Sequence, residues 1–227
     1  MSNKNSKTFL VDGAKGHTGT YLLKALLNHY PHCNIVATDL PLERRGELMT
    51  KETIFSKRFG YMLKILEDPR IKFIPADLTD LDSLIPLFEN QKYEVIFHPA
   101  SLYDYFAELD MLRKINVNGT ENLLEIICKT QDLEKLRFIH WSTCGVYGEP
   151  EYKYDQEGYV IPADEKTPYN PPNNYSISKK EQEDILKEYM EVYNLKATIV
   201  RSAPIYGPYQ TYGTYHILLM LKILGTG

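Results

Sequence analysis

The sequence predicts an α/β protein in which helices cover both faces of a doubly wound parallel sheet. Short β-rich runs alternate along the chain with longer segments of helical spacing, as in sheets whose strands are joined by crossover helices. The β-rich runs are apolar without strict alternation, as expected for strands buried on both faces. The length of 227 residues suits one large domain or two small ones, and we assign residues 1–227 to one domain. Ligands of such sheets bind at the carboxyl ends of the strands.

Each element is predicted from its own local pattern. The strands are short runs rich in β-branched and aromatic residues: Phe9–Asp12, Asn34–Asp39, Lys72–Pro75, Val95–Phe97, Arg137–Ser142 and Ala197–Arg201. The helices have apolar residues three and four positions apart: Tyr21–His29, Leu81–Glu89, Asp110–Lys129 and Tyr175–Tyr193, with an extra helix over Glu43–Leu66. Gly145–Asn174 is rich in proline and tyrosine and is predicted to be an ordered loop. A helix-like run, Thr214–Leu224, closes the chain, which then ends abruptly.

The composition indicates a globular protein without affinity for polyanions. Hydrophobic residues make up 43% of the chain and charged residues 25%, close to the globular average. The 26 basic and 30 acidic residues leave a formal net charge of −4. This balance gives no electrostatic footprint for nucleic acid or for an anionic membrane, so neither is an expected partner.

Targeting and redox features predict a cytoplasmic protein. No apolar run approaches the roughly 20 residues of a membrane span. The amino terminus lacks the long apolar core and small-residue cleavage site of a signal peptide. Cys33, Cys128 and Cys144 are odd in number and widely spaced, which fits neither a disulfide framework nor a metal site and indicates a reducing compartment.

A glycine-rich turn after the first strand predicts a dinucleotide-binding site. Gly13, Gly16 and Gly19 stand at a strand-to-helix junction, where they let the backbone approach a pyrophosphate at the helix N-terminus. Asp39 closes the second strand 20 residues beyond Gly19, where its carboxylate can accept hydrogen bonds from an adenosine ribose. A solvated acid at a strand end is the alternative for Asp39. A carboxylate there repels a 2′-phosphate, so NAD is predicted in preference to NADP. Nearby cations argue weakly the other way, but a solvated surface is their expected place: Lys15, Arg44 and Arg45.

A second group of residues indicates acid–base chemistry on a hydroxyl group. Tyr175 and Lys179 are four residues apart and share one helical face, for which an ordinary exposed face is the alternative. Lowering the pKa of a phenol from about 10 to about 7 takes roughly 4 kcal/mol, which a cation about 4 Å away supplies at an effective dielectric near 20. Such a tyrosine can take a hydroxyl proton while hydride leaves the same carbon.

Ser142 and Thr143 lie at the end of the fifth predicted strand, where a hydroxyl group would polarise a substrate oxygen. Capping of its own turn is the alternative for Ser142.

These motifs occur together in the order of a known family. Over about residues 8 to 208 the chain resembles the extended short-chain dehydrogenase/reductases, the NAD-dependent epimerase/dehydratase group, which implies a Rossmann-type sheet. The matching segments are GAKGHTG, Asp39, Ala76-Asp77-Leu78, His98-Pro99-Ala100-Ser101, Asn116-Val117-Asn118-Gly119-Thr120, STCGVYG, YSISK and Arg201–Pro208.

The resemblance implies roles for individual residues. Thr143 matches the catalytic Ser/Thr, Tyr175 the acid/base, and Lys179 the residue that holds the cofactor ribose and lowers the pKa of the phenol. The implied cofactor contacts, beyond the three glycines and Asp39, are His17, Thr18, Asp77, Leu78, Pro99, Ala100, Ser101, Leu102, Asn116, Tyr175 and Lys179. The helices Asp110–Lys129 and Tyr175–Tyr193 match those that pair two subunits, which implies a homodimer.

The chain departs from the family pattern in three places. Asp12 replaces the small hydroxyl residue that usually precedes the first glycine. Pro204 stands where an asparagine is common, which weakens any transfer of substrate contacts to this segment. The family continues into a substrate-binding region, of which this chain would hold only the start, from about residue 204.

Three functions are compatible with these residues. The first is an NAD-dependent epimerase or dehydratase that transfers hydride at a carbinol or carbonyl carbon, with a nucleotide sugar as the small-molecule substrate. The second is a dehydrogenase of the 3β-hydroxysteroid type, because the aromatic segment around Tyr103, Tyr105 and Phe106 would suit an apolar substrate. The third is a dinucleotide-binding sensor or scaffold without turnover.

Three reactive side chains are interpreted as packing residues. His98 and His140 lie in strands without a second ligand at metal spacing, so no metal is expected at either. Cys144 has no activating base in the sequence and is interpreted as a small filler near the site.

Overall fold

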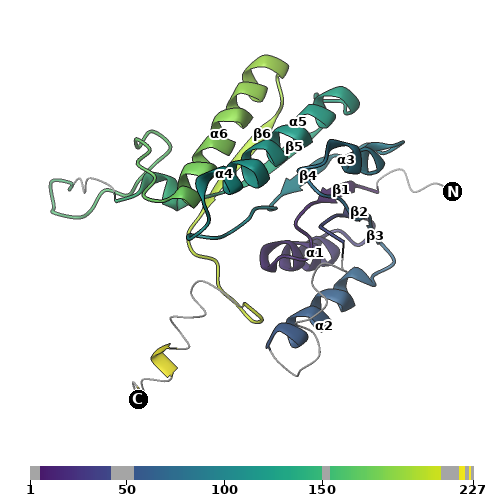
Figure 1. Cartoon of the computed structure of the whole chain (residues 1–227), viewed down its shortest axis with the longest axis horizontal. Helices are drawn as coiled ribbons and strands as arrows, with labels where there is room; N and C mark the ends of the chain where they lie inside the picture. Colours follow the sequence, from purple (N-terminus) through teal and green to yellow (C-terminus); the bar gives the residue numbers. More distant parts are fainter. Residues whose placement is uncertain (1–5, 42–53, 150–153, 211–219, 223–224, 226–227) are drawn as a thin grey trace.

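A computed structural model describes residues 6–41, 54–149, 154–210, 220–222 and 225 of the chain. Its centre is a six-stranded sheet in the order β3-β2-β1-β4-β5-β6, and every neighbouring pair of strands is parallel (Figure 1). The predicted doubly wound fold is therefore confirmed. The strands are β1 (Thr8–Val11), β2 (Asn34–Ala37), β3 (Ile71–Phe73), β4 (Val95–His98), β5 (Arg137–Thr143) and β6 (Ala197–Ser202).

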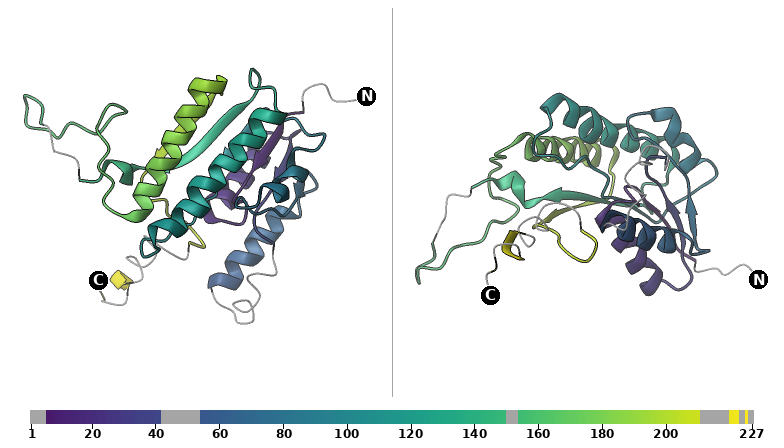
Figure 2. Two further views of the ribbon diagram at one scale, coloured as in Figure 1. Left: turned by 45° about the horizontal axis from the view of Figure 1, so that its top comes forward. Right: turned by 60° about the horizontal axis from the view of Figure 1, so that its bottom comes forward.

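Helices lie on both faces of the sheet (Figure 2). α1 (His17–His29) and α2 (Ile54–Leu66) cover one face, while α3 (Leu81–Phe88), α5 (Asn118–Thr130) and α6 (Asn174–Tyr193) cover the other, with the short α4 (Leu109–Leu112) beside them. Successive side chains of β1 lie on opposite faces of the sheet. Leu10 packs against α3 and α5, whereas Phe9 and Val11 pack against α1. Burial on both sides explains the consecutive apolar positions. None of the described helices is long and apolar enough to cross a membrane.

The starts of the helices follow from local hydrogen bonds. Asp80 caps α3 by accepting the N–H of Asp82, and Asn173 caps α6 by accepting the N–H of Ser176. In contrast, α1 begins directly after Gly16 without a side-chain cap. An uncapped helix N-terminus is a favourable place for an anion.

The observed elements agree with the predicted bounds within two residues, with two exceptions among the helices. α1 begins four residues before the predicted Tyr21, because the glycine-rich turn leads straight into the helix. The predicted helix Asp110–Lys129 is divided into α4, a π-helical turn η2 (Arg113–Val117) and α5. Apolar periodicity does not distinguish a π-helical turn from the α-helix around it.

Three predicted segments are described only in part. The part of Glu43–Leu66 that is described is helical as α2, and only 220–222 and 225 of the closing segment are described, of which 220–222 are helical. The described parts of Gly145–Asn174 are mainly irregular, as predicted for a loop. They contain most of a 3₁₀ turn, η3 (Cys144–Tyr147), and an antiparallel bridge between Tyr154 and Val160.

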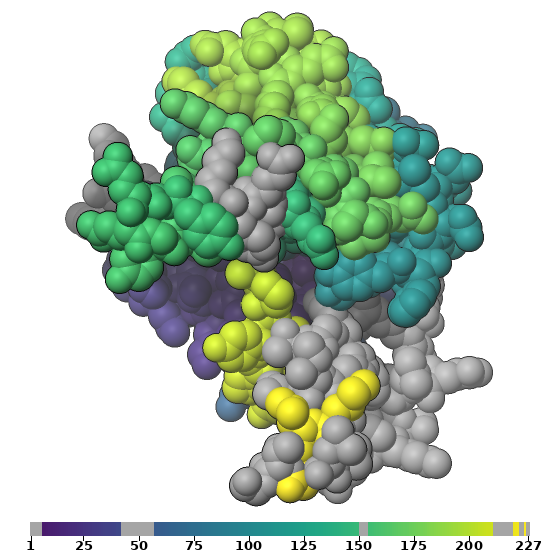
Figure 3. Space-filling model, turned by 90° about the vertical axis from the view of Figure 1, so that its left-hand side faces the viewer, coloured from purple at the N-terminus to yellow at the C-terminus, as the bar shows by residue number. Residues whose placement is uncertain are grey.

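The segment that follows β6 packs against the first turns of α1. Figure 3 shows it in yellow-green, crossing the purple amino-terminal part of the chain. The rings of His17, Tyr21, Tyr61 and Tyr209 form a continuous row, with successive centroids 5.0, 5.7 and 5.0 Å apart. The hydroxyl of Tyr21 also donates to the carbonyl of Pro208 at 3.1 Å. These contacts hold Tyr209 and its neighbours beside the glycine-rich turn.

Candidate functional site

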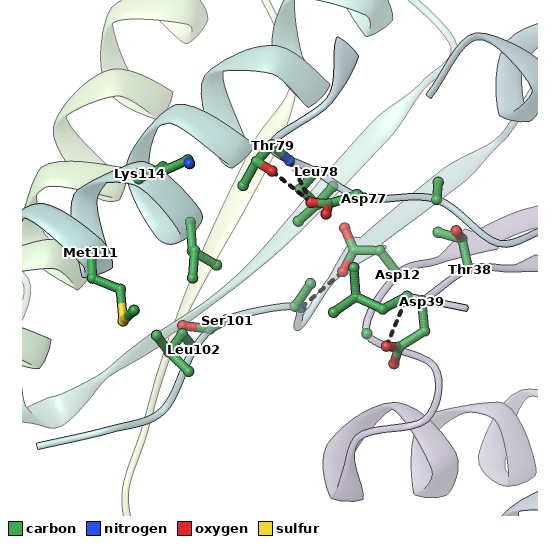
Figure 4. A pocket seen from close by; sticks show the side chains of 15 residues that line it. Asp12, Thr38, Asp39, Asp77, Leu78, Thr79, Ser101, Leu102, Met111 and Lys114 are labelled. Carbon is green, nitrogen blue, oxygen red and sulfur yellow. Dashed lines mark hydrogen bonds between the residues drawn. The ribbon is translucent and has the colours of Figure 1, made fainter. Parts of the chain in front are cut away.

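A cavity of about 530 Å³ opens at the carboxyl ends of β1, β2, β3 and β4 (Figure 4). It spans the point at which the strand order reverses, where doubly wound sheets bind ligands. The lining residues that the sequence predicted as cofactor contacts are Gly13, Asp39, Asp77, Leu78, Ala100, Ser101 and Leu102. Those that it did not predict as contacts are Asp12, Thr38, Leu40, Ala76, Thr79, Met111, Lys114 and Ile115.

The other predicted residues do not line this cavity. They are Gly16, His17, Thr18, Gly19, Pro99, Asn116, Thr143, Tyr175 and Lys179. The first four belong to the turn and the start of α1, and the last three to β5 and α6. The cavity therefore brings together part of the predicted cofactor contacts, and the residues predicted to be catalytic lie outside its lining.

The glycines of the turn are required by close backbone packing. Gly13 has a φ of +54°, and a Cβ there would lie 2.8 Å from the Cα of Ala100. A Cβ on Gly19 would lie 2.2 Å from the carbonyl oxygen of Gly13. A side chain at either position would therefore clash with neighbouring backbone atoms and displace the turn.

Asp39 is fixed in the cavity wall by backbone hydrogen bonds. One carboxylate oxygen accepts the N–H of Lys15 and the other accepts the N–H of Leu40, both at 2.8 Å. Each oxygen keeps a further lone pair, so the carboxylate can still accept ribose hydroxyls.

Lys15 does not lie on a solvated surface, so this expectation was wrong. Its side chain is buried, because the turn directs it over the end of the sheet. The ammonium group donates to the carbonyl of Leu40 and lies 5.4 Å from the centre of the Phe73 ring. Arg44 and Arg45 lie outside the described residues.

Asp12 joins the ends of β1 and β4 beneath the cavity. One oxygen of its buried carboxylate accepts the N–H of Ala100 at 2.8 Å, and the other pairs with Nδ1 of His98. A small hydroxyl group, usual at this position, offers one oxygen instead of two. The ring of His98 stacks on that of His140 at 5.3 Å, and both rings are fully buried, as expected for packed histidines.

Asp77 and Asn116 hold the loops on the far side of the cavity. Asp77 accepts the backbone N–H and the hydroxyl of Thr79, at 2.9 and 2.8 Å. The amide of Asn116 pairs with the backbone of Leu102, accepting its N–H at 2.7 Å and donating to its carbonyl at 3.2 Å. Asn116 thus shapes a loop of the cavity wall from the η2 turn.

The polar atoms of the cavity wall fit a dinucleotide. The hydroxyl oxygens of Thr38 and Ser101 are buried and have no hydrogen-bond partner within the described part of the chain. A buried hydroxyl without a partner costs about 1–3 kcal/mol, so polar ligand atoms would be stabilised beside them. Together with the cradle at Gly13 and the carboxylate of Asp39, these groups suit the ribose and pyrophosphate of NAD.

The predicted catalytic residues lie on two elements that are in contact: Thr143 ends β5, and Tyr175 and Lys179 lie in the first turns of α6. Thr143 accepts the N–H of Gly145 at 3.1 Å and so caps η3. A Cβ on Gly145 would lie 2.8 Å from the hydroxyl of Ser176 and 3.3 Å from that of Thr143, so the strand end and the first turn of α6 are in close contact. The capping role considered for Ser142 belongs to Thr143, and the hydroxyl of Ser142 donates to Glu183 instead.

Aromatic rings surround Tyr175. Tyr103 and Tyr105, which follow β4, meet its ring edge-on with centroids 4.9 and 5.6 Å away. Tyr175 is 8% exposed, whereas Tyr103 is 37% and Tyr105 50% exposed. The phenol therefore lies at the base of a partly open aromatic wall.

Lys179 is held in an environment that opposes its charge. Burial lowers its pKa from 10.5 to about 7, although the carboxylates of Asp12 and Glu183 act in the opposite direction. The same burial, together with the charge on Lys179, keeps the pKa of His140 well below its usual value. The ammonium group of Lys179, one helical turn after Tyr175, therefore titrates near neutral pH.

This pKa predicts a rise in stability with pH. Between about pH 7 and about pH 10, the unfolded chain binds a proton at Lys179 that the folded chain does not, so the free energy of unfolding increases as the pH rises. We expect the wild type to gain about 2 kcal/mol relative to Lys179→Met between pH 7 and pH 9, at about 1.4 kcal/mol per unit. Urea unfolding of both proteins at several pH values measures this gain. Parallel pH dependences would contradict the lowered pKa.

One residue near the site differs from its sequence interpretation, and another was missed. Cys144, interpreted as a small filler near the site, is exposed, because it leaves the buried strand β5 and begins the η3 turn. Glu183 was not singled out, although it is fully buried beside the site. An acidic residue four positions after Lys179, on the same helical face, was the available signal.

Comparison with known proteins agrees with this geometry. Residues 9–223 match the NAD dependent epimerase/dehydratase family. The human dTDP-D-glucose 4,6-dehydratase is 30% identical over 210 residues, which cover 90% of this chain and 53% of that protein. The trifunctional UDP-glucose 4,6-dehydratase/UDP-4-keto-6-deoxy-D-glucose 3,5-epimerase/UDP-4-keto-L-rhamnose-reductase of Arabidopsis thaliana is 28% identical, over 90% of this chain and 28% of that protein. The chain thus spans about half the length of the first of these relatives, and less of the second.

Solved structures show the same fold. UDP-glucuronic acid 4-epimerase from Bacillus cereus, in complex with NAD, superposes with a TM-score of 0.73 at 25% identity, over 96% of this chain and 63% of that one. dTDP-glucose 4,6-dehydratase from Bacillus anthracis, in complex with NAD, gives a TM-score of 0.72 at 24% identity, over 97% and 62%. With the family match over nearly its whole length, the chain belongs to the NAD-dependent epimerase/dehydratase family.

Proposed function

We propose that the chain is the NAD-binding part of an enzyme that epimerises or dehydrates a nucleotide sugar. The observation that carries this proposal is the position of Tyr175 and Lys179, which are both buried on α6. α6 packs against β5, and the ends of other strands in the same sheet form the cavity. The similar proteins whose names specify dTDP- and UDP-sugars support this substrate class. The residues from about 204 onward would then begin the substrate-binding region.

The cavity favours NAD over NADP. The carboxylate of Asp39 is oriented by two backbone N–H groups, so it can accept ribose hydroxyls but would repel a 2′-phosphate. Lys15, which could offset this charge, directs its ammonium group to the carbonyl of Leu40. The pyrophosphate would lie at Gly13 and the uncapped start of α1.

In this proposal β5 supplies a hydrogen-bond donor to the substrate oxygen, and α6 supplies the acid–base group. No described residue accepts the hydroxyl proton of Thr143, so Thr143 can donate to the substrate oxygen, whereas the proton of Ser142 goes to Glu183. Tyr175 would take the proton of the substrate hydroxyl, and the charge of Lys179 would lower the pKa of its phenol. When bound, NAD would accept hydride from the same carbon.

A second candidate is a dehydrogenase of the 3β-hydroxysteroid type. The observation in its favour is the aromatic wall around Tyr175, beside which Phe106, the residue after Tyr105, is 97% exposed. An apolar substrate would bury more of this wall than a sugar would.

The same family membership supports two broader proposals. The chain would form a homodimer through α5 and α6, which lie side by side and border a shallow cavity of about 320 Å³ lined by residues such as Val117 and Ile185. It would act in the cytoplasm, in keeping with its three unpaired cysteine thiols.

The nucleotide that the purified chain carries tests the proposal first. Denaturation should release NAD or NADH, and an empty chain should bind NAD more tightly than NADP in a titration of Trp141 fluorescence. Trp141 is the chain's single tryptophan and precedes Ser142. Turnover of dTDP- or UDP-hexoses would support the first candidate, turnover of a hydroxysteroid the second, and binding without turnover a sensor. Failure to bind either nucleotide would contradict all three.

Asp39→Ser should change the cofactor preference. Loss of the charge-assisted hydrogen bonds is expected to weaken NAD binding at least about tenfold, and loss of the charge should strengthen NADP binding. The dissociation constants of both nucleotides measure the change. An unaltered ratio would place the adenosine ribose away from Asp39.

A further inference from the structure

Glu183 lies on the buried face of α6, one turn after Lys179 and two turns after Tyr175. Its side chain is fully buried, yet it carries a carboxylate. Side chains from three other segments donate hydrogen bonds to it: Ser142 at 2.5 Å, Tyr169 at 2.8 Å, and Arg201 through Nε at 3.0 Å and through Nη2 at 2.7 Å. A buried carboxylate surrounded by donors in this way crosslinks the segments that supply them.

The three donors belong to the segments that shape the catalytic end of the sheet. Ser142 is in β5, directly before Thr143, and Arg201 is its register partner in β6. Tyr169 comes from the loop that leads into α6, and its hydroxyl also accepts a hydrogen bond from Lys187 at 2.6 Å. One carboxylate therefore connects α6 to both strands and to the loop.

The charge of Glu183 is balanced within this cluster. Burial acts to raise its pKa, but the hydrogen bonds from Arg201, Ser142 and Tyr169 outweigh burial and hold the pKa below its usual value. Arg201 is also packed against the rings of Tyr147 and Tyr169, 5.2 and 5.1 Å from their centres. The ion pair is thus enclosed, and breaking one side of it leaves a buried charge without its partner.

We propose that Glu183 is a positioning residue of the site, which holds the strand end at Ser142 and Thr143 and the loop at Tyr169 in place against the helix of Tyr175 and Lys179. The expected effect of Glu183 on turnover rests on the proposed function, whereas its structural role does not. Glu183 would act through Ser142 and the strand end, without touching the substrate. Lys179 also faces Asp12 and His140 from β1 and β5, so Glu183 is one of several groups that share its surroundings.

Glu183→Gln tests the proposal because it keeps the size of the side chain. In glutamine an NH₂ group replaces one of the two carboxylate oxygens. Both oxygens accept hydrogen bonds in the wild type and an NH₂ group only donates, so at least one hydrogen bond must be lost. We expect amide hydrogen exchange to become at least about tenfold faster in peptides that cover 141–148 and 165–172, since a hydrogen bond to a charged group contributes about 1.5–3 kcal/mol. Peptides of β1 and α1 should keep their protection. Glu188→Gln, on the exposed side of the same helix, is the matched control and should change neither.

Turnover gives the second readout. In an active wild type, kcat should fall about 10²-fold, as expected for a small displacement of catalytic groups. The Michaelis constant for the sugar and the NAD affinity, read from Trp141, should stay within about threefold. The Ser142→Ala and Glu183→Gln effects on kcat should not multiply in the double variant, because both act through the same contact.

The two proposals can fail separately. A wild type that binds neither NAD nor NADP would contradict the proposed function, while the exchange result still decides the role of Glu183. Exchange that is unchanged, or faster everywhere by the same factor, would overturn the positioning role. If Glu183→Gln does not fold, Ser142→Ala and Tyr169→Phe each remove one donor and keep the pair with Arg201. Local acceleration near the removed donor would support the role, and its absence in both would overturn it.

Discussion

Replacing Tyr175 with phenylalanine is expected to lower turnover by about 10²–10⁴-fold, the range measured when a general acid–base group is lost. The ring would keep its edge-on contacts with Tyr103 and Tyr105, because only the hydroxyl is removed. Stability and NAD affinity should therefore stay close to those of the wild type. Steady-state kinetics with the nucleotide sugar, together with an NAD titration, separate the two effects.

Tyr189→Phe is the matched control for this variant. Tyr189 lies further along α6, where it packs on the apolar core away from the site. It loses the same hydroxyl from the same helix, so its turnover should be unchanged. A Tyr175→Phe variant as active as Tyr189→Phe would exclude Tyr175 as the acid–base group.

Gly19→Ala is expected to disable the cofactor turn. The new Cβ would lie 2.2 Å from the carbonyl oxygen of Gly13 and 2.9 Å from the Cα of Ala14, both backbone atoms. The turn must move to accommodate it, which should weaken NAD binding at least about tenfold and lower the free energy of unfolding by about 1–3 kcal/mol. Nucleotide titration and urea unfolding measure the two losses.

Gly60→Ala controls for the change of residue type. Gly60 lies within α2, and a Cβ there meets no atom within 4 Å in the described part of the chain. Alanine is favoured over glycine in helices by about 1 kcal/mol, so this variant should be slightly more stable and bind NAD normally. Equal losses in the two variants would show that the contact at Gly13 is unimportant.

The sheet could be predicted from the sequence because its strands have a simple pattern. Leu10 and its neighbours in β1 are buried on opposite faces, which requires apolar residues at consecutive positions. The predicted start of α1 lies four residues after the observed one, because the glycine and histidine residues of its first turn have low helix propensity. Asn116, in the η2 turn, accepts the N–H of Leu102, fourteen residues away in the sequence, and no local pattern contains such a contact.

The candidate site was only partly predictable for a similar reason. The glycines, Asp39, Tyr175 and Lys179 could be predicted as site residues because each belongs to a motif with fixed spacing. Lys15 and Glu183 are charged residues, which are usually exposed, and their burial depends on partners from other segments. Sequence patterns give the chemistry of a side chain, whereas its surroundings are decided by the tertiary fold.

The contact between Asp12 and His98 affects how the folding chain comes to bind a ligand. These residues are 86 positions apart, and the segment that follows β4, Ala100–Leu102, supplies the cavity wall beside the glycine-rich turn. Closing so long a loop is slow compared with forming the local helices. A partly folded chain with only β1, α1 and β2 would have the turn but not this wall. A dinucleotide that needs both would bind only after β4 has paired with β1. It would then stabilise the folded chain by mass action, without guiding the earlier steps of folding.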